Sequence, residues 1–430
     1  MINLTPGQRA NYNRADTCER NIRSVREVTL GLLAYCRASD WAGYDPYDGL
    51  NSRLFKAMPL SSVRIFRLML TQAMKTSPVN LRPLLGVCKT QNSKGLALFL
   101  TAILKLRKLG LLKDNYLSQA LVAQIIALRS PDTEYWSWGY SFPWQTRTML
   151  VPRGAPNLVC TIFVANALLD AFEALGDTRC LEMALSAGDY LVKKLYYTEG
   201  DTLASFCYPL PTSKAKVHNA NFLAAAFLSR LYCRTGDKRF VGPALQAARY
   251  SAGKQRSDGS WSYGELPKQG WIDNFHTGYN LFALRAIDRY LGTSEFEPHI
   301  RPGFEFYRAH FFGQHGTVRY FHNRTYPIDI HCVAQSLLTL LEFQDLDSTN
   351  LSLARSVYTW TMKNMWDEGG FFYYRVLRTV TIRTPYMRWS QAWMLLALVT
   401  VLEHCPAEKA AAPEGLPAMA LTSTSFLQPV

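Results

Sequence analysis

The stretch Trp271–Asn280 holds the side chains best spaced to move a proton. On a helix that begins here, His276 and Asn280 lie one turn apart on one face, and Tyr279 lies beside them. An imidazole and a phenol placed in this way could act as base and acid. The structural alternative is that Asp273 caps the helix and His276 is a hydrogen-bonded core residue.

A similar arrangement recurs at Tyr326–Gln335, where Asp329 and His331 stand at a helix start and Gln335 follows one turn later. Recurrence at equivalent positions of two helices favours a functional role for both histidines. No HExxH-like spacing connects the histidines, so we expect no metal site. No phosphate-binding or nucleotide-binding motif is present, and we expect no cofactor.

A third polar cluster opens the last apolar segment, at Arg383–Trp393. Arg388 and Gln391 are three residues apart, and Trp389 and Trp393 are four apart, which predicts adjacent charged and aromatic stripes on a helix. An arginine there could bind a carboxylate with two hydrogen bonds, and indoles could stack on sugar rings. The alternative is tryptophan packing with an ion pair between helices.

Other arginines, amides and aromatic residues stand in loops that precede the apolar segments. Amides at such places either cap helices or bind hydroxyl and carboxylate groups. The candidate catalytic residues are His276, Tyr279, His331 and Arg388. The candidate substrate-binding residues are Trp144, Arg147, Arg153, Asn157, Asn219, Trp261, Tyr263, Trp271, Asp273, Gln335, Arg383 and Trp389.

The elements that must position these residues form an internal repeat. Apolar helical segments start about every 55 to 62 residues, and amphipathic segments lie between them. Helices that are apolar nearly all round are typical of an inner ring, and amphipathic ones of an outer ring. The pattern predicts an all-α (α/α)6 toroid whose aromatic, glycine-bearing loops crowd one end. The apolar segments are 95–109, 157–174, 219–231, 275–287, 331–343 and 386–402.

Three regions are expected along the chain. Residues 1–90 look helical but do not follow the repeat, so we expect an N-terminal extension packed on the toroid. Residues 91–405 form the toroid, and residues 406–430, rich in Ala, Pro, Ser and Thr, form a disordered tail. No apolar run reaches the ~20 residues of a membrane span, and no signal-peptide core is visible. We therefore expect a cytoplasmic protein, with action in the periplasm left open.

Composition restricts the partners. The 430 residues carry a formal net charge of +14, which favours anionic ligands. Lys and Arg are scattered rather than clustered in runs, so we expect no nucleic-acid partner. Nine cysteines without a CxxC pair indicate reduced, buried thiols rather than a disulfide framework.

Five motifs together resemble a toroid family encoded in bacterial exopolysaccharide and capsule gene clusters. More distantly, the chain looks like the toroid parts of uronate polysaccharide lyases and glucuronyl C5-epimerases. The resemblance implies an acidic polysaccharide or oligosaccharide as ligand and an association with polysaccharide assembly machinery. The motifs span residues 43–48, 81–86, 152–157, 271–279 and 388–393.

Three functions remain open at this point. Removal of the C5 proton of a uronate, by a lyase or an epimerase, would use His276 or His331 as base and Tyr279 as acid. Arg388, or Arg147 with Asn219, would neutralise the carboxylate. A glycoside hydrolase would need two carboxyl groups, for which Asp273 and Asp329 are candidates and Glu265 is a third. A glycan-binding protein of polysaccharide assembly would need neither histidine.

Overall fold

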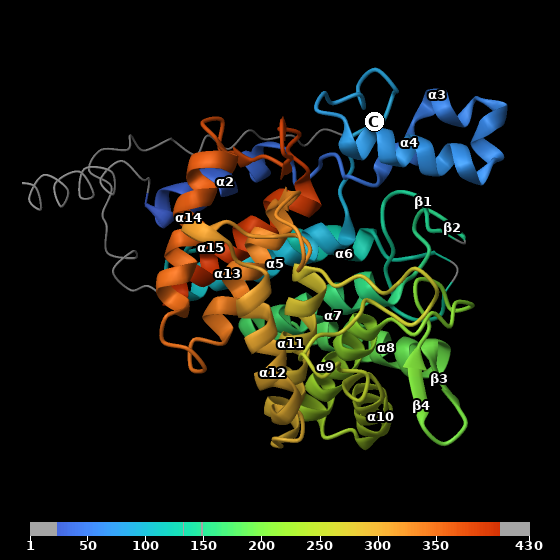
Figure 1. The fold of residues 1–430 in the computed structure, drawn as a ribbon. Coiled ribbons are helices and arrows are strands. Elements are labelled where there is room, and N and C mark those ends of the chain that lie inside the picture. The colour runs from blue at the N-terminus through green and yellow to red at the C-terminus, as the bar shows by residue number, and fades with distance from the viewer. Residues whose placement is uncertain (1–23, 132, 148, 405–430) are drawn as a thin grey trace, which may run out of the picture.

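The computed structural model describes residues 24–131, 133–147 and 149–404. The expected tail at 406–430 lies outside these residues. Within them, helices dominate and the strands are short. Six inner helices form a ring in which each packs against the next, and α15 packs against α5 to close it (Figure 1). The inner helices are α5 (Ser93–Lys108), α7 (Leu158–Leu175), α9 (His218–Thr235), α11 (Asn274–Leu291), α13 (Ile330–Glu342) and α15 (Trp393–His404).

Outer helices cover this ring. Each of five outer helices packs on the inner helix that precedes it in the chain. They are α6 (Tyr116–Ala127), α8 (Thr178–Tyr190), α10 (Val241–Ala252), α12 (Glu297–His310) and α14 (Asn350–Met365). The architecture is an (α/α)6 toroid, as the repeat predicted.

The sixth outer helix comes from the other end of the chain. Helix α2 (Val25–Ala38) packs against α15, beside the turn that leads into it. Residues 1–90 were expected to form an extension packed on the toroid, and within them α2 takes the place of the sixth outer helix. The repeat did not reveal this because α2 precedes its partner by most of the chain.

Burial explains why the two kinds of helix differ in sequence. Every residue of α13 from Ile330 to Leu341 is buried, because neighbours cover this inner helix on all sides. The outer helix α14 buries only one stripe, which includes Ala354, Val357 and Thr361. Asn or Asp side chains cap four of the inner helices, and the caps include Asn157, Asp273 and Asp329.

The remaining elements lie in the connections. Helices η1 (Asp48–Asn51), α3 (Arg53–Lys56), η2 (Pro59–Ser62) and α4 (Arg64–Thr76) form a lobe that projects from the ring (Figure 1). Short antiparallel pairings join β1 (Trp144–Gln145) to β2 (Leu150–Val151), β3 (Tyr196–Glu199) to β4 (Leu203–Phe206), and β6 (Trp366–Asp367) to β7 (Phe371–Phe372). A three-stranded sheet, in the order β5-β8-β9, joins Ile328–Asp329, Arg375–Val376 and Thr381–Ile382.

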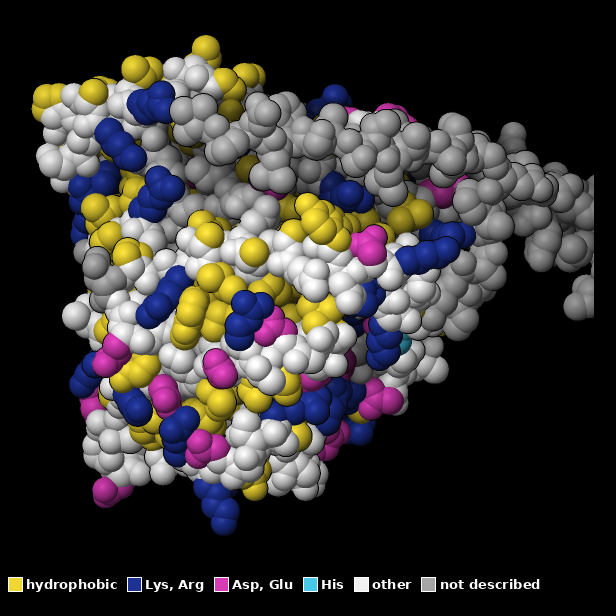
Figure 2. All heavy atoms as spheres, turned by 180° about the vertical axis from the view of Figure 1, so that it is seen from behind, with side chains coloured by type: hydrophobic (Ala, Val, Ile, Leu, Met, Phe, Trp, Pro, Cys, Tyr) yellow, Lys and Arg dark blue, Asp and Glu magenta, His cyan; other side chains and the backbone are white. Residues whose placement is uncertain are grey.

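The surface charges and the apolar helices relate to two expectations, the lack of a nucleic-acid partner and the lack of a membrane span. Figure 2 shows Lys and Arg dispersed among Asp and Glu over the back face, rather than gathered in one strip. Among the described residues, one helix, α7, is long and apolar enough to cross a membrane. Most of α7 is buried inside the ring, and a core helix passes the same length and composition test.

Candidate active site

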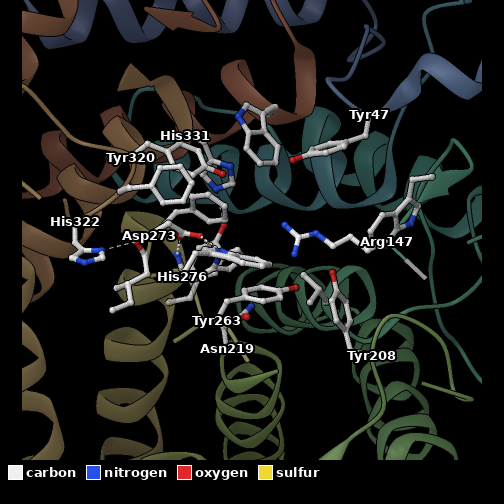
Figure 3. Close-up of a pocket in the computed structure, with 18 of the residues that line it drawn as sticks. Tyr47, Arg147, Tyr208, Asn219, Tyr263, Asp273, His276, Tyr320, His322 and His331 are labelled. Carbon is white, nitrogen blue, oxygen red and sulfur yellow. Dashed lines mark hydrogen bonds and ion pairs between the residues drawn. The ribbon is translucent and has the colours of Figure 1, made fainter. Parts of the chain in front are cut away.

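A cavity of about 830 Å³ lies at the end of the ring where the inner helices begin. Every inner helix, or the turn that leads into it, contributes a residue from its N-terminal end to the lining. These residues are Lys94, Val159, Asn219, His276, His331 and Arg388. Arg147 enters the same cavity from the loop between β1 and β2 and faces the side on which His276 and His331 lie (Figure 3).

Asp273 fixes the orientation of the His276 imidazole. Its Oδ1 accepts the backbone N–H of His276 at 3.0 Å, which caps α11, and its Oδ2 lies 2.7 Å from His276 Nδ1. Trp271 donates its indole N–H to the same Oδ2 at 3.0 Å. The Asp273 side chain is 1% exposed and that of His276 is 21% exposed, so a ligand reaches the imidazole and not the carboxylate. With Nδ1 held, Nε2 is left to exchange a proton.

Tyr279 and His331 form a second pair beside the first. The Tyr279 hydroxyl lies 2.7 Å from His331 Nε2, and the imidazole stacks between Phe275 and Trp393. Burial lowers the pKa of His331 well below 6.5, and the nearby charges of Lys94 and Arg388 lower it further. Burial raises the pKa of Tyr279 well above 10. Both groups are therefore neutral near pH 7, and His331 positions the phenol rather than carrying a charge.

Arg388 binds a carboxylate, but one supplied by its own chain. Its Nε and NH2 groups donate to the two oxygens of Asp45 at 2.6 and 2.8 Å. Arg388 stands in a π-helical turn, η6 (Met387–Ala392), which points it and Trp389 into the cavity. Because Asp45 already occupies the guanidinium fork, Arg388 is not available as the bidentate clamp for a ligand that the sequence analysis expected.

The expected binding residues divide into two groups. Trp144, Arg147, Asn219, Tyr263, Trp271, Asp273 and Trp389 line the cavity. Arg153, Asn157, Trp261, Gln335 and Arg383 do not, which corrects the expectation for these five.

Most of these five residues have structural contacts. Asn157 caps α7, Trp261 donates to the buried carbonyl of Ser251, and Gln335 donates to Thr339. Arg383 lies over the ring of Tyr373, and Arg153 is exposed on a turn outside the cavity.

The carboxyl pair expected for a hydrolase is not present in the cavity. Asp329 is fully buried, where Arg375 donates to its Oδ2 and Trp389 donates to its Oδ1 at 2.8 Å. Glu265 accepts the hydroxyl of Tyr250 outside the cavity. Among the described residues, Asp273 is the one carboxylate in the lining. The same residues contain no group of three side chains suited to hold a metal ion.

Several residues of the lining were not among the candidates from the sequence. Tyr140 and Tyr320 belong to the aromatic loops that were expected at this end, but they were not singled out. Tyr47 comes from the irregular segment before η1, whose place in the fold no repeat indicates. Lys94 stands at the start of the first inner helix, and comparing helix starts would have pointed to it. The other such lining residues are Phe142, Val159, Tyr208, Gly270, Ile272, Phe275, Phe321, His322, Asn323 and Arg324.

Comparisons with known proteins establish the fold. No family model and no curated protein matches the sequence. Similar solved structures include an unsaturated glucuronyl hydrolase solved with dGlcA-Glc-Rha-Glc, with a TM-score of 0.59, 13% identity, and coverage of 90% of this chain and 97% of that one. Cellobiose 2-epimerase from Bacillus thermoamylovorans has a TM-score of 0.58 and 10% identity, over 74% of this chain and 90% of that one.

A third similar structure is a family 76 glycoside hydrolase (mannosidase) from Bacteroides thetaiotaomicron, with a TM-score of 0.52 and 12% identity, over 73% of this chain and 86% of that one. At these identities the three structures show a shared fold.

Proposed function

We propose, on the basis of the shared toroid and its cavity, that the protein is a carbohydrate-active enzyme that removes the C5 proton of a uronate-containing saccharide. The observation that carries the proposal is the Asp273–His276 pair, which stands beside Tyr279 in a cavity rich in cations and aromatic rings. Enzymes of this class need a base near C5, an acid, and positive charge near the carboxylate.

The reaction assigns a role to each group. His276 Nε2 takes the C5 proton, while Asp273 holds the imidazole in one tautomer and stabilises the imidazolium that forms. Tyr279 then gives its proton either to the oxygen leaving C4, in a lyase, or to the opposite face of C5, in an epimerase. In the lyase the C4–O bond breaks and a C4–C5 double bond forms.

The shape of the cavity favours a saccharide of limited length. Ligand pockets for small molecules measure roughly 300–1,000 Å³, and the volume of about 830 Å³ lies in that range. Tyr263 and Trp271 stack on each other with ring centres 4.5 Å apart and offer a flat apolar wall for a sugar ring. The names of the similar structures, a cellobiose epimerase and a glucuronyl hydrolase, agree with a saccharide ligand.

The motif resemblance supports a further part of the proposal. It suggests that the saccharide derives from a bacterial exopolysaccharide or capsule and that the protein works beside polysaccharide assembly machinery. A two-carboxylate hydrolase is disfavoured because Asp329 lies outside the cavity, in an ion pair with Arg375.

The experiment is incubation with uronate-containing polysaccharides and oligosaccharides in heavy water. A lyase raises the ultraviolet absorbance of an unsaturated uronate, and an epimerase incorporates deuterium at C5 without cleavage. New reducing ends without either signal would indicate a hydrolase and contradict the proposal.

We expect His276→Ala to abolish the proton transfer, a loss of about 10² to 10⁴-fold in rate, with little change in melting temperature because the side chain is partly exposed. The matched control is His310→Ala, an exposed histidine outside the cavity, which should leave the rate unchanged. Saccharide binding that survives in His276→Ala without any reaction in the wild type would favour a glycan-binding protein.

A further inference from the structure

One buried cation in the cavity has no carboxylate partner. The described chain buries five Lys or Arg side chains, and four of them form ion pairs with acidic residues. These pairs are Arg82–Asp48, Arg230–Asp170, Arg375–Asp329 and Arg388–Asp45. The fifth, Lys94, is 4% exposed, and the described residues provide no ion pair for it. Burying an ammonium without a counter-charge is costly, and an anionic ligand that supplies the counter-charge lowers this cost.

Aromatic rings, rather than hydrogen-bond acceptors, surround the Lys94 ammonium. Its Nζ lies 3.9 Å from the ring centre of Phe163, 5.4 Å from that of Trp393 and 5.7 Å from that of Tyr279. Lys94 and Tyr279 line the cavity, whereas Phe163 and Trp393 lie outside its lining, so the ammonium stands where the cavity meets the core, which we call its floor. Ring faces stabilise a cation but accept no strong hydrogen bond from it.

The charged neighbours of Lys94 do not neutralise it. Burial lowers the pKa of Lys94 to about 7, and the charge of Arg388 lowers it further. The thiol of Cys160 and the carboxylate of Asp45 act in the opposite direction, but Asp45 is already bound by both donors of Arg388. His331 and Tyr279, two further titratable groups nearby, are both neutral near pH 7.

We propose that Lys94 is the residue that pairs with the carboxylate of the sugar ligand at the floor of the cavity. The inference rests on the proposed function in one respect, because it takes the ligand to be an acidic sugar. In this role Lys94 takes the place of Arg388 as the cation that neutralises the ligand carboxylate, because Arg388 is already paired with Asp45. Because Lys94 lies against the Tyr279 ring, the pairing brings the carboxylate-bearing carbon close to the phenol.

The test compares D-glucuronate with D-glucose, its neutral counterpart, by calorimetric titration. The wild type should prefer glucuronate. Lys94→Met keeps the length of the side chain and removes the charge, so we expect its affinity for glucuronate to fall about tenfold or more and its affinity for glucose to stay unchanged. Lys254→Met is the matched control, because Lys254 also lies over a ring, that of Tyr250, but is exposed and outside the cavity.

A second measurement follows the lysine side chains by NMR. Reductive methylation with ¹³C-formaldehyde places an NMR label on each lysine, and Lys94→Met identifies the Lys94 signal. That signal should shift when glucuronate is added and not when glucose is added. If Lys94→Met failed to fold, the signal that moves with glucuronate in the wild type would still have to be one whose ammonium titrates near pH 7.

Three results separate this inference from the proposed reaction. No preference for glucuronate in the wild type, or the same preference in Lys94→Met, overturns the pairing. A preference that depends on Lys94 in a protein without proton-transfer activity supports the pairing and overturns the reaction. Proton transfer that Lys94→Met leaves intact supports the reaction and overturns the pairing.

Discussion

Asp273 serves the fold and the site with the same carboxylate. One oxygen caps α11 and the other holds the His276 ring, so helix capping and base orientation are compatible. This contact was predictable because the two residues are three apart on one helix. The contact of Arg388 with Asp45 was not, because 343 residues separate the partners and no local pattern connects them. For the same reason the sequence predicts that Arg388 lines the cavity, but it does not show that Asp45 already pairs with the guanidinium.

The lowered pKa of Lys94 predicts how the stability of the folded protein depends on pH. Its pKa is about 7 in the folded protein and 10.5 ordinarily. Between these values the unfolded chain holds a proton that the folded chain lacks, so the contribution of Lys94 to stability rises with pH. Lys94→Met should therefore be more stable than the wild type below pH 7, and the difference should shrink as the pH approaches 10.5. Thermal unfolding of both proteins across this range checks it, and a difference independent of pH would contradict it.

At the scale of helices, the sequence predicts the inner ring better than the outer one. The inner helices were predictable because burial on all sides makes them apolar throughout, and the expected segment 157–174 corresponds to α7 at Leu158–Leu175. The outer helix α2 was not recognised, because an amphipathic pattern predicts a helix but not which surface its apolar stripe covers. The three-dimensional contacts, and not the sequence pattern, show that α2 packs on α15.

Substitution in α2 tests whether this helix is part of the ring. Leu32 is fully buried on the face that packs into the core. Leu32→Ala should lower the free energy of unfolding by about 2–5 kcal/mol and shift the main transition in urea. Ala34→Ser, at an exposed position of the same helix, is the control and should change little. A separate early transition, with the main one unmoved, would mean that α2 is only an appendage.

Over the whole molecule, the cavity depends on contacts between the two ends of the chain. Asp45 comes from the segment before the first inner helix, and Arg388 from the turn before the last. Asp45→Asn leaves a buried guanidinium without its counter-charge, which should cost about 3–5 kcal/mol in the free energy of unfolding. Chemical denaturation measures it, and Asp45→Asn with Arg388→Met should recover part of the loss. Equal loss in the single and double variants would show that the charge is not the cause.

The packing of α2 on α15 has a consequence for how the protein is made. A ribosome releases Val25–Ala38 long before Trp393–His404, since it adds about 5–20 residues per second. The nascent helix therefore waits roughly 20 to 70 seconds for α15, the helix that it packs against in the folded protein. During that interval chaperones have an exposed surface to bind, and a transcript cut short before the codon of Arg388 would encode an incomplete cavity.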